Sequence, residues 1–284
     1  MHLPIPFIGL GEYITVTLNE DEKGMTLKRL PFQQIASKWL KTYIMSQDDE
    51  LSRYLPQTAR WHPNVLFKML KQFGSVYLKP DKGGGGAGII RVKLTDSHRY
   101  EVRYGIRRQV IVGETTLISY LRRRMQPHKR YLIQQGIRLA HVDGRPFDIR
   151  VVLQKPRDQW IVMGMAAKVA AKKKIVTNRA NGGIAATVPK VLQAGFGWRD
   201  EHVRLVEHVL NRIALRTAAV LSTRFPGLRV LGLDVGIDVR GNVWIFEVNT
   251  RPQFRLFQQT DPVRYRQIVR NQRQIVADGR KRLN

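Results

Sequence analysis

Apolar residues recur along this chain at two spacings, one typical of helices and the other typical of strands. In the stretch 200–225, Val203, Val206, Leu210 and Ile213 share one helical face, so a long helix packed on a core is expected there. Further helical patterns cover 30–45, 50–73 with a break at YLPQT, 114–125, and a last segment that starts at the capping sequence TDP. Strand-like patterns cover 76–79, 89–94, 98–104, 109–112, 131–135, 147–154, 160–169, and the runs VLGLDVGIDV and VWIFEVN, which the turn RGN joins. This mixture predicts an α+β protein of two lobes.

The stretch KPDKGGGGAG, residues 79–88, lies between two of the expected strands. Its glycines match the dinucleotide fingerprint G-x-G-x-x-G in form, but that motif needs a helix after the glycines, and a strand-like run follows here. No G-K-[ST] follows, as a P-loop requires, and the kinase signatures H-R-D and D-F-G are absent. Two interpretations stay open: a flexible lid whose backbone N–H groups close over phosphates, and a glycine-rich hairpin turn that binds nothing.

The stretch GLDVGIDVRGNVWIFEVNTRP, residues 232–252, brings polar oxygen atoms into two apolar strands. Glu247 and Asn249 share one face by the two-residue period of a strand, and Asp234 on the neighbouring strand can point the same way. Two carboxylates and an amide oxygen suit Mg²⁺. The alternative is that these acids pair with some of the many arginines, because a buried carboxylate needs a metal or a cation in either case.

The charge balance indicates an acidic partner. The chain has 49 Lys and Arg against 22 Asp and Glu, a net charge of +27 and a pI near 11.0. Such a field attracts acidic peptides, nucleotides, nucleic acid or anionic lipid, while a merely solvated basic surface stays open. Nucleic acid is possible but less favoured, because the aromatic residues are not interleaved with the basic runs. Without cysteine there is no disulfide, thiolate nucleophile or cysteine-bound zinc. No apolar run is long enough for a membrane span and no signal peptide is evident, so a cytoplasmic location is expected.

Several motifs in one order carry a resemblance: a lysine before the glycine lid, YLIQQGI, FDIRVVLQ, NRANGG and a final D…E-x-N. Together they resemble the ATP-grasp superfamily, most closely the YheC/YheD group of endospore-associated proteins and more distantly the RimK-type ligases. The resemblance covers roughly residues 32–258. It implies two α+β lobes that hold a nucleotide between antiparallel sheets. The expected organisation is a short N-terminal segment (1–31), an N-terminal lobe with the lid (32–135), a C-terminal lobe with the metal site (136–258) and a basic C-terminal helix (259–284).

The resemblance also implies roles for individual residues. The implied nucleotide-binding residues are Lys38, Lys79, Lys82, Gly84, Gly85, Gly86, Gln134 and Gln135. The residues implied to reach the phosphates or the reacting carboxylate are Arg150, Lys168 and Asn178, and the implied Mg²⁺ ligands are Asp234, Glu247 and Asn249. This chain departs from the family by lacking a serine in the lid, by having Lys168 where arginine is expected, and by having only about 30 residues before the first matching motif.

The implied activity is that of a carboxylate–amine ligase with ATP and Mg²⁺ as cofactors. ATP would phosphorylate a carboxylate, and an amine would attack the acyl phosphate to give an amide. The charge favours an acidic peptide or another polyanion as the substrate, with an amine as co-substrate. Two alternatives stay open: a nonenzymatic polyanion-binding protein associated with spores, and a kinase that stops at phosphoryl transfer.

Overall fold

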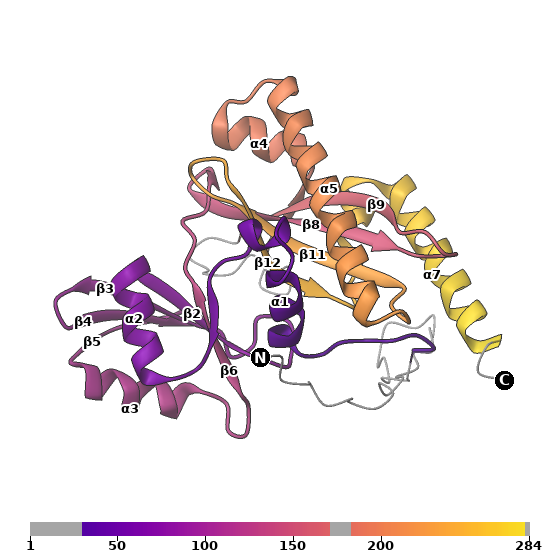
Figure 1. Ribbon diagram of the computed structural model, residues 1–284. Helices are drawn as coiled ribbons and strands as arrows, with labels where there is room; N and C mark the ends of the chain where they lie inside the picture. The colour runs from indigo at the N-terminus through magenta and orange to yellow at the C-terminus, as the bar shows by residue number, and fades with distance from the viewer. Residues whose placement is uncertain (1–29, 171–182, 282–284) are drawn as a thin grey trace.

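The protein has an α+β fold built on two antiparallel sheets (Figure 1). Each sheet has its own hydrophobic core. The computed structural model describes residues 30–170 and 183–281. The first sheet has the strand order β1-β6-β2-β3-β4-β5. Its strands are β1 Thr58–Arg60, β2 Ser75–Pro80, β3 Ile90–Asp96, β4 Arg99–Tyr104, β5 Arg107–Val112 and β6 Tyr131–Gln135, and its helices are α2 Pro63–Phe73 and α3 Glu114–Arg124.

Alternation along the strands of the first sheet separates a core face from an open face. Leu78 and Val92 are buried against α2 and α3, as are Val76 and Ile90 on the same two strands. The intervening residues Tyr77, Lys79 and Arg91 therefore project from the opposite face. Since α2 and α3 cover only the first of these faces, the second is available for the other lobe.

The second sheet is covered by helices on both faces. Its strands run in the order β10-β9-β8-β11-β12, and the short strand β7 pairs with β8. Phe147 and Val151 on β8 pack toward the long helix α5, whereas Val152 packs toward α6 and α7. These elements are β7 His141–Val142, β8 Arg145–Gln154, β9 Ile161–Val169, β10 Ile184–Ala186, α4 Val188–Phe196, α5 Asp200–Arg224, β11 Val230–Ile237, β12 Val243–Asn249, α6 Leu256–Thr260 and α7 Pro262–Lys281.

The helix α1, Lys38–Ser46, and the short 3₁₀ helix η1, Leu51–Tyr54, pack on the second sheet although they precede the first in the chain. Met45 and Leu51 are fully buried in the same cluster as Leu210 and Ile213 of α5. This segment was expected in the N-terminal lobe, but its side chains complete the core of the second sheet. The lobe boundaries themselves stay predictions.

The two antiparallel sheets and most of the expected strands are confirmed. The expected helix 50–73 is wrong in part, because it resolves into η1, β1 and α2, where Pro63 opens the helix and Gly74 ends it in a left-handed conformation. The expected helix 30–45 begins only at Lys38, where Ser37 caps it. In the described ranges, no helix is both long and apolar enough to cross a membrane.

We predict that Leu51→Ala lowers the free energy of unfolding by about 2–5 kcal/mol, because this side chain is fully buried between α1 and α5. Urea denaturation followed by circular dichroism measures the change. Leu205→Ala is the matched control, since Leu205 is 65% exposed on α5 and should change stability by less than about 0.5 kcal/mol. Equal effects of the two substitutions would show that η1 is not part of this core.

Candidate functional site

A pocket lies between the open face of the first sheet, helix α1 and β12 of the second sheet. Its walls combine aliphatic and aromatic carbon with several lysine ammonium groups and one carboxylate. Such a lining suits a flat, partly apolar ligand that carries negative charge at one end. The lining residues are Lys38, Lys41, Thr42, Thr58, Lys79, Leu132, Gln134, Phe246, Glu247 and Val248.

Two of the pocket lysines have little opposite charge near them: Lys41 is buried and Lys79 is half-buried. Burial lowers the pKa of Lys79 to about 8, and the attraction of Glu247 offsets only part of this effect. Burial lowers the pKa of Lys41 to about 8 as well. Lys79 donates to Oε1 of Gln134 at 2.5 Å, and Lys41 donates to the carbonyl of Ile35 at 2.8 Å. Because both partners are uncharged, an anion in the pocket would stabilise both lysines.

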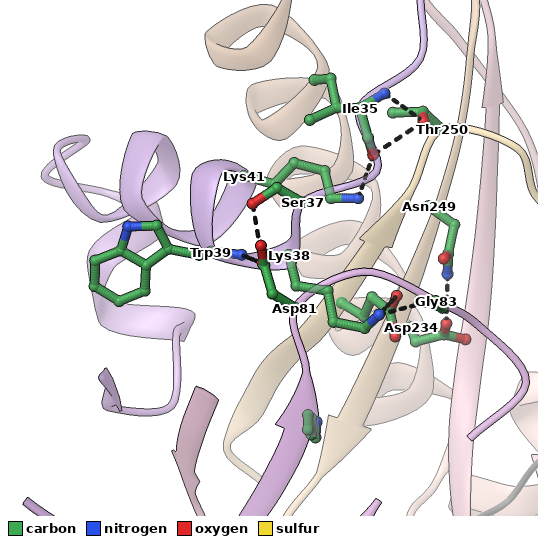
Figure 2. A network of polar contacts seen from close by, with 12 residues as sticks. Ile35, Ser37, Lys38, Trp39, Lys41, Asp81, Gly83, Asp234, Asn249 and Thr250 are labelled. Carbon is green, nitrogen blue, oxygen red and sulfur yellow. Dashed lines mark hydrogen bonds and ion pairs between the residues drawn. The ribbon is translucent and has the colours of Figure 1, made fainter. Parts of the chain in front are cut away.

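The glycine loop is tied to the start of α1. Asp81 accepts from the hydroxyl of Ser37 at 2.9 Å and from the backbone N–H of Trp39 at 2.8 Å (Figure 2). Lys38 donates its ammonium to the carbonyl of Gly83 at 2.5 Å. The loop backbone at Gly83, Gly85, Gly86 and Gly88 has positive φ. Any larger side chain at these positions would be strained, so the four glycines are required by this loop conformation.

A largely buried charge network lies beside the pocket and centres on Asp234, whose side chain is 16% exposed. Arg150 binds this carboxylate with two nitrogens, at 3.0 and 2.9 Å, and the ammonium of Lys168 lies 2.8 Å from it. Asn249 donates its amide to the same carboxylate at 2.9 Å (Figure 2). Burial alone would raise the pKa of Asp234, but Arg150 and then Lys168 hold it at about 2. This carboxylate is therefore ionised at any ordinary pH.

Asp148 extends the network to a second carboxylate. Its Oδ1 lies 2.8 Å from the Lys168 ammonium. Burial raises the pKa of Asp148 to about 6, although Lys168 opposes the rise. Burial would in turn lower the pKa of Lys168, but Asp234 and Asp148 raise it above its ordinary value. Lys168 therefore remains a cation between two acids.

The structure brings most of the expected site residues into these two adjacent groups. Lys38, Lys79, Gln134 and Glu247 line the pocket, while Arg150, Lys168, Asp234 and Asn249 form the network.

The remaining expected residues lie elsewhere. The side chain of Gln135 accepts from the backbone of Gln57 at 3.1 Å. Lys82 and Gly84 are exposed in the loop, together with Gly85, and Gly86 is half-buried there. Asn178 lies outside the described residues.

Several residues of the pocket wall were not expected from the sequence. Lys41 and Thr42 follow Lys38 by three and four residues, so the helical period of α1 could have placed all three on one face. The others carry no such signal, because they meet only when the two lobes come together. They are Thr58, Leu132, Phe246 and Val248.

The oxygen atoms at the edge of the pocket are of the chemical type that Mg²⁺ prefers as ligands. Glu247 is 3.5 Å from the Lys38 ammonium, and Asn249 uses its amide nitrogen on Asp234, which leaves its carbonyl oxygen as a donor. Among the described residues, no three His, Asp or Glu side chains gather in one place, so an amide oxygen would have to complete the set. Asp234 could join these ligands only by exchanging part of its contact with Arg150 and Lys168.

Comparison with known proteins gives three kinds of similarity. The family described as YheC/D like ATP-grasp matches residues 31–275. The endospore coat-associated protein YheD of Bacillus subtilis (strain 168) is 30% identical over 232 residues, which cover 78% of this chain and 49% of YheD. The endospore coat-associated protein YheC of the same organism is 23% identical over 246 residues, covering 82% of this chain and 64% of YheC. The chain thus spans half to two thirds of the length of these relatives.

The fold itself also has counterparts among solved structures. D-alanyl-alanine synthetase A from Vibrio cholerae O1 biovar eltor superposes with a TM-score of 0.52 at 10% identity, covering 86% of this chain and 65% of that one. At this identity the likeness concerns the fold alone. The two antiparallel sheets of this chain are therefore arranged as in ATP-grasp enzymes.

We predict that affinity for ATP falls about tenfold between pH 7.5 and pH 9.5. Lys79 and Lys41 have lowered pKa values of about 8, so each loses its charge over this range and with it the attraction for phosphate. Titration calorimetry at several pH values measures the slope. Lys79→Met should bind ATP more weakly and show a flatter profile. An unchanged slope in that variant would mean that Lys79 does not face the phosphates.

Proposed function

The chain belongs to the YheC/D-like ATP-grasp family, and from this premise we propose that it is an ATP-dependent carboxylate–amine ligase. The observation that carries the proposal is the pairing of a lysine-lined pocket between the lobes with a buried charge network at its edge. The proposed substrate is an acidic peptide or another polyanion, joined to an amine. The net charge of +27 supports that choice, because it exceeds the charge of one bound nucleotide many times over.

Nucleotide binding is assigned to the pocket. Leu132, Phe246 and Val248 offer apolar surface to an adenine ring, and the amide of Gln134 offers it hydrogen bonds. Lys38 and Lys79 would bind the phosphates, since both line the pocket, one from α1 and the other from β2. The glycine loop, whose first carbonyl already contacts Lys38, would cover the phosphates with its backbone N–H groups. Lys82 and the glycines Gly84, Gly85 and Gly86 belong to this cover, and Gln135 continues the strand behind it.

Phosphoryl transfer is assigned to the network. Mg²⁺ held by Asp234, Glu247 and Asn249 would neutralise phosphate charge. Arg150 and Lys168 would attract the substrate carboxylate and the phosphoryl oxygens, and Asn178 is proposed to assist them. The carboxylate oxygen forms a bond to the γ-phosphorus and ADP leaves. The amine then attacks the acyl carbon, phosphate leaves with the bonding electron pair, and the amine releases a proton to solvent.

A second candidate is a nonenzymatic protein that binds polyanions in a spore layer. It is favoured by one observation: both oxygens of Asp234 are already neutralised by Arg150 and Lys168, as in a purely structural ion cluster. A spore location is proposed here by analogy with the endospore coat-associated relatives.

The proposal is tested by calorimetry with ATP and Mg²⁺, followed by an assay of ADP release in the presence of acidic peptides and candidate amines. Binding with ADP release and a new amide, identified by mass spectrometry, is the expected result. A phosphorylated acid without an amide would indicate a kinase. No binding at millimolar ATP would favour the nonenzymatic protein.

We predict that Glu247→Gln reduces turnover at least about a hundredfold while the protein stays folded, because it keeps the side-chain shape and removes one charge from the proposed Mg²⁺ site. Steady-state ADP release measures the loss. Glu201→Gln is the matched control, since Glu201 is exposed in the first turn of α5, far along the chain from the site. Full activity of Glu247→Gln would refute the metal assignment.

A further inference from the structure

The open face of the first sheet carries a row of side chains that leads from the pocket to the edge of the sheet. The strand register pairs Gln134 with Tyr77, Tyr77 with Arg91, Arg91 with Arg103, and Arg103 with Arg108. Paired residues in a sheet project from the same face. Because Gln134 lines the pocket, the three arginines continue outward from it. At about 4.8 Å per strand, Gln134 and Arg108 are about 19 Å apart.

We call Arg91, Arg103 and Arg108 the arginine row. A single acid, Glu101, organises its outer part. Oε1 of Glu101 accepts from Nε of Arg103 at 2.9 Å, and Oε2 accepts from Nε of Arg108 at 2.6 Å. Glu101 is only 6% exposed, so it contacts the two guanidinium groups on their buried side. Both contacts use Nε alone, which leaves the terminal amino groups of each arginine for another ligand.

Neighbouring acids neutralise only part of the positive charge of the arginine row. Like charges on paired positions of neighbouring strands destabilise a sheet, and here three arginines occupy consecutive strands. In the part of the chain that the structure describes, Glu101 is the one acid in contact with any of them. An arrangement that costs stability in the unliganded protein is explained if an anionic ligand completes it.

The surroundings of the row favour a peptide as that ligand. Val110 is 53% exposed and is paired with Glu101, and Val112 is 60% exposed on the same face of β5. Exposed aliphatic side chains beside arginines match a chain of mixed acidic and apolar residues. Nucleic acid would instead call for stacking aromatic side chains. A second copy that packed through the same face would place arginines against arginines.

We infer that the arginine row binds the acidic segment of an extended peptide substrate, whose carboxylates pair with the terminal amino groups of the row. The peptide would cross the strands of the first sheet and deliver its reacting end to the pocket. Peptide binding by the arginine row adds a substrate site to the proposed ligase function. The identification of the peptide as the substrate rests on that proposed function. The row would also give the substrate a place to bind while a nucleotide occupies the pocket.

The test uses the full chain and fluorescently labelled deca-glutamate, which extends over about 33 Å and so spans the row. Fluorescence anisotropy at fixed salt measures its affinity. Arg91→Gln/Arg108→Gln should weaken binding at least tenfold. The matched control, Arg107→Gln/Arg122→Gln, removes the same charge from exposed positions off the open face and should weaken it less than threefold. Calorimetry with ATP reports whether the pocket is intact in both variants.

Equal losses in the two variants would overturn the inference, because binding would then follow net charge alone. Absence of deca-glutamate binding to the unmodified chain would overturn it too. A third outcome concerns labelled decathymidylate. If it binds as tightly as deca-glutamate, and if Arg91→Gln/Arg108→Gln weakens it while the control variant does not, the row binds nucleic acid and the peptide inference is refuted. If deca-glutamate binds through the row and ATP does not bind at all, the peptide surface stands and the proposed ligase function fails.

Discussion

The ion cluster around Asp234 is the constraint on which the second lobe and the proposed chemistry both depend. Removing one partner of such a buried pair typically costs about 3–5 kcal/mol, because the remaining charge is left in a medium of low polarity. Asp234 pairs in register with Arg150 on β8, and Asp148 pairs with Lys168 on β9. A slip of one residue in any of these strands would separate the charges. Electrostatics therefore fixes the same register that apolar alternation fixes.

The fold was predictable where a pattern is long enough to repeat. The strands beside the glycine loop and the helix α5 have several turns or alternations each, and the structure confirms them. The three-residue strand β1 has no period of its own and exists because Thr58–Arg60 pairs with β6. The placement of η1 was equally hidden, since burial of Leu51 against α5 is a contact between distant parts of the chain.

The same distinction applies to the site. The set Asp234, Glu247 and Asn249 was visible because one hairpin brings it together, and hairpin register follows from local spacing. The electrostatic state of that set was not visible. Sequence could not show that Arg150 and Lys168 reach Asp234 from two other strands, nor that burial lowers the pKa of Lys79 and Lys41 together.

The attachment of α1 has a mechanical consequence. The helix is anchored in the core of the second lobe through Met45, and the segment before it is bound to Thr250 at the end of β12 through Ile35. Its first turn, however, holds Asp81 and Gly83 of the loop that belongs to the first sheet. The helix thus connects the two sheets: it is packed into the core of the second and hydrogen-bonded to the glycine loop of the first. A rotation of the first sheet away from the second would therefore have to break the hydrogen bonds of Asp81 and Gly83 to the start of α1, unless the glycine loop stayed with the helix.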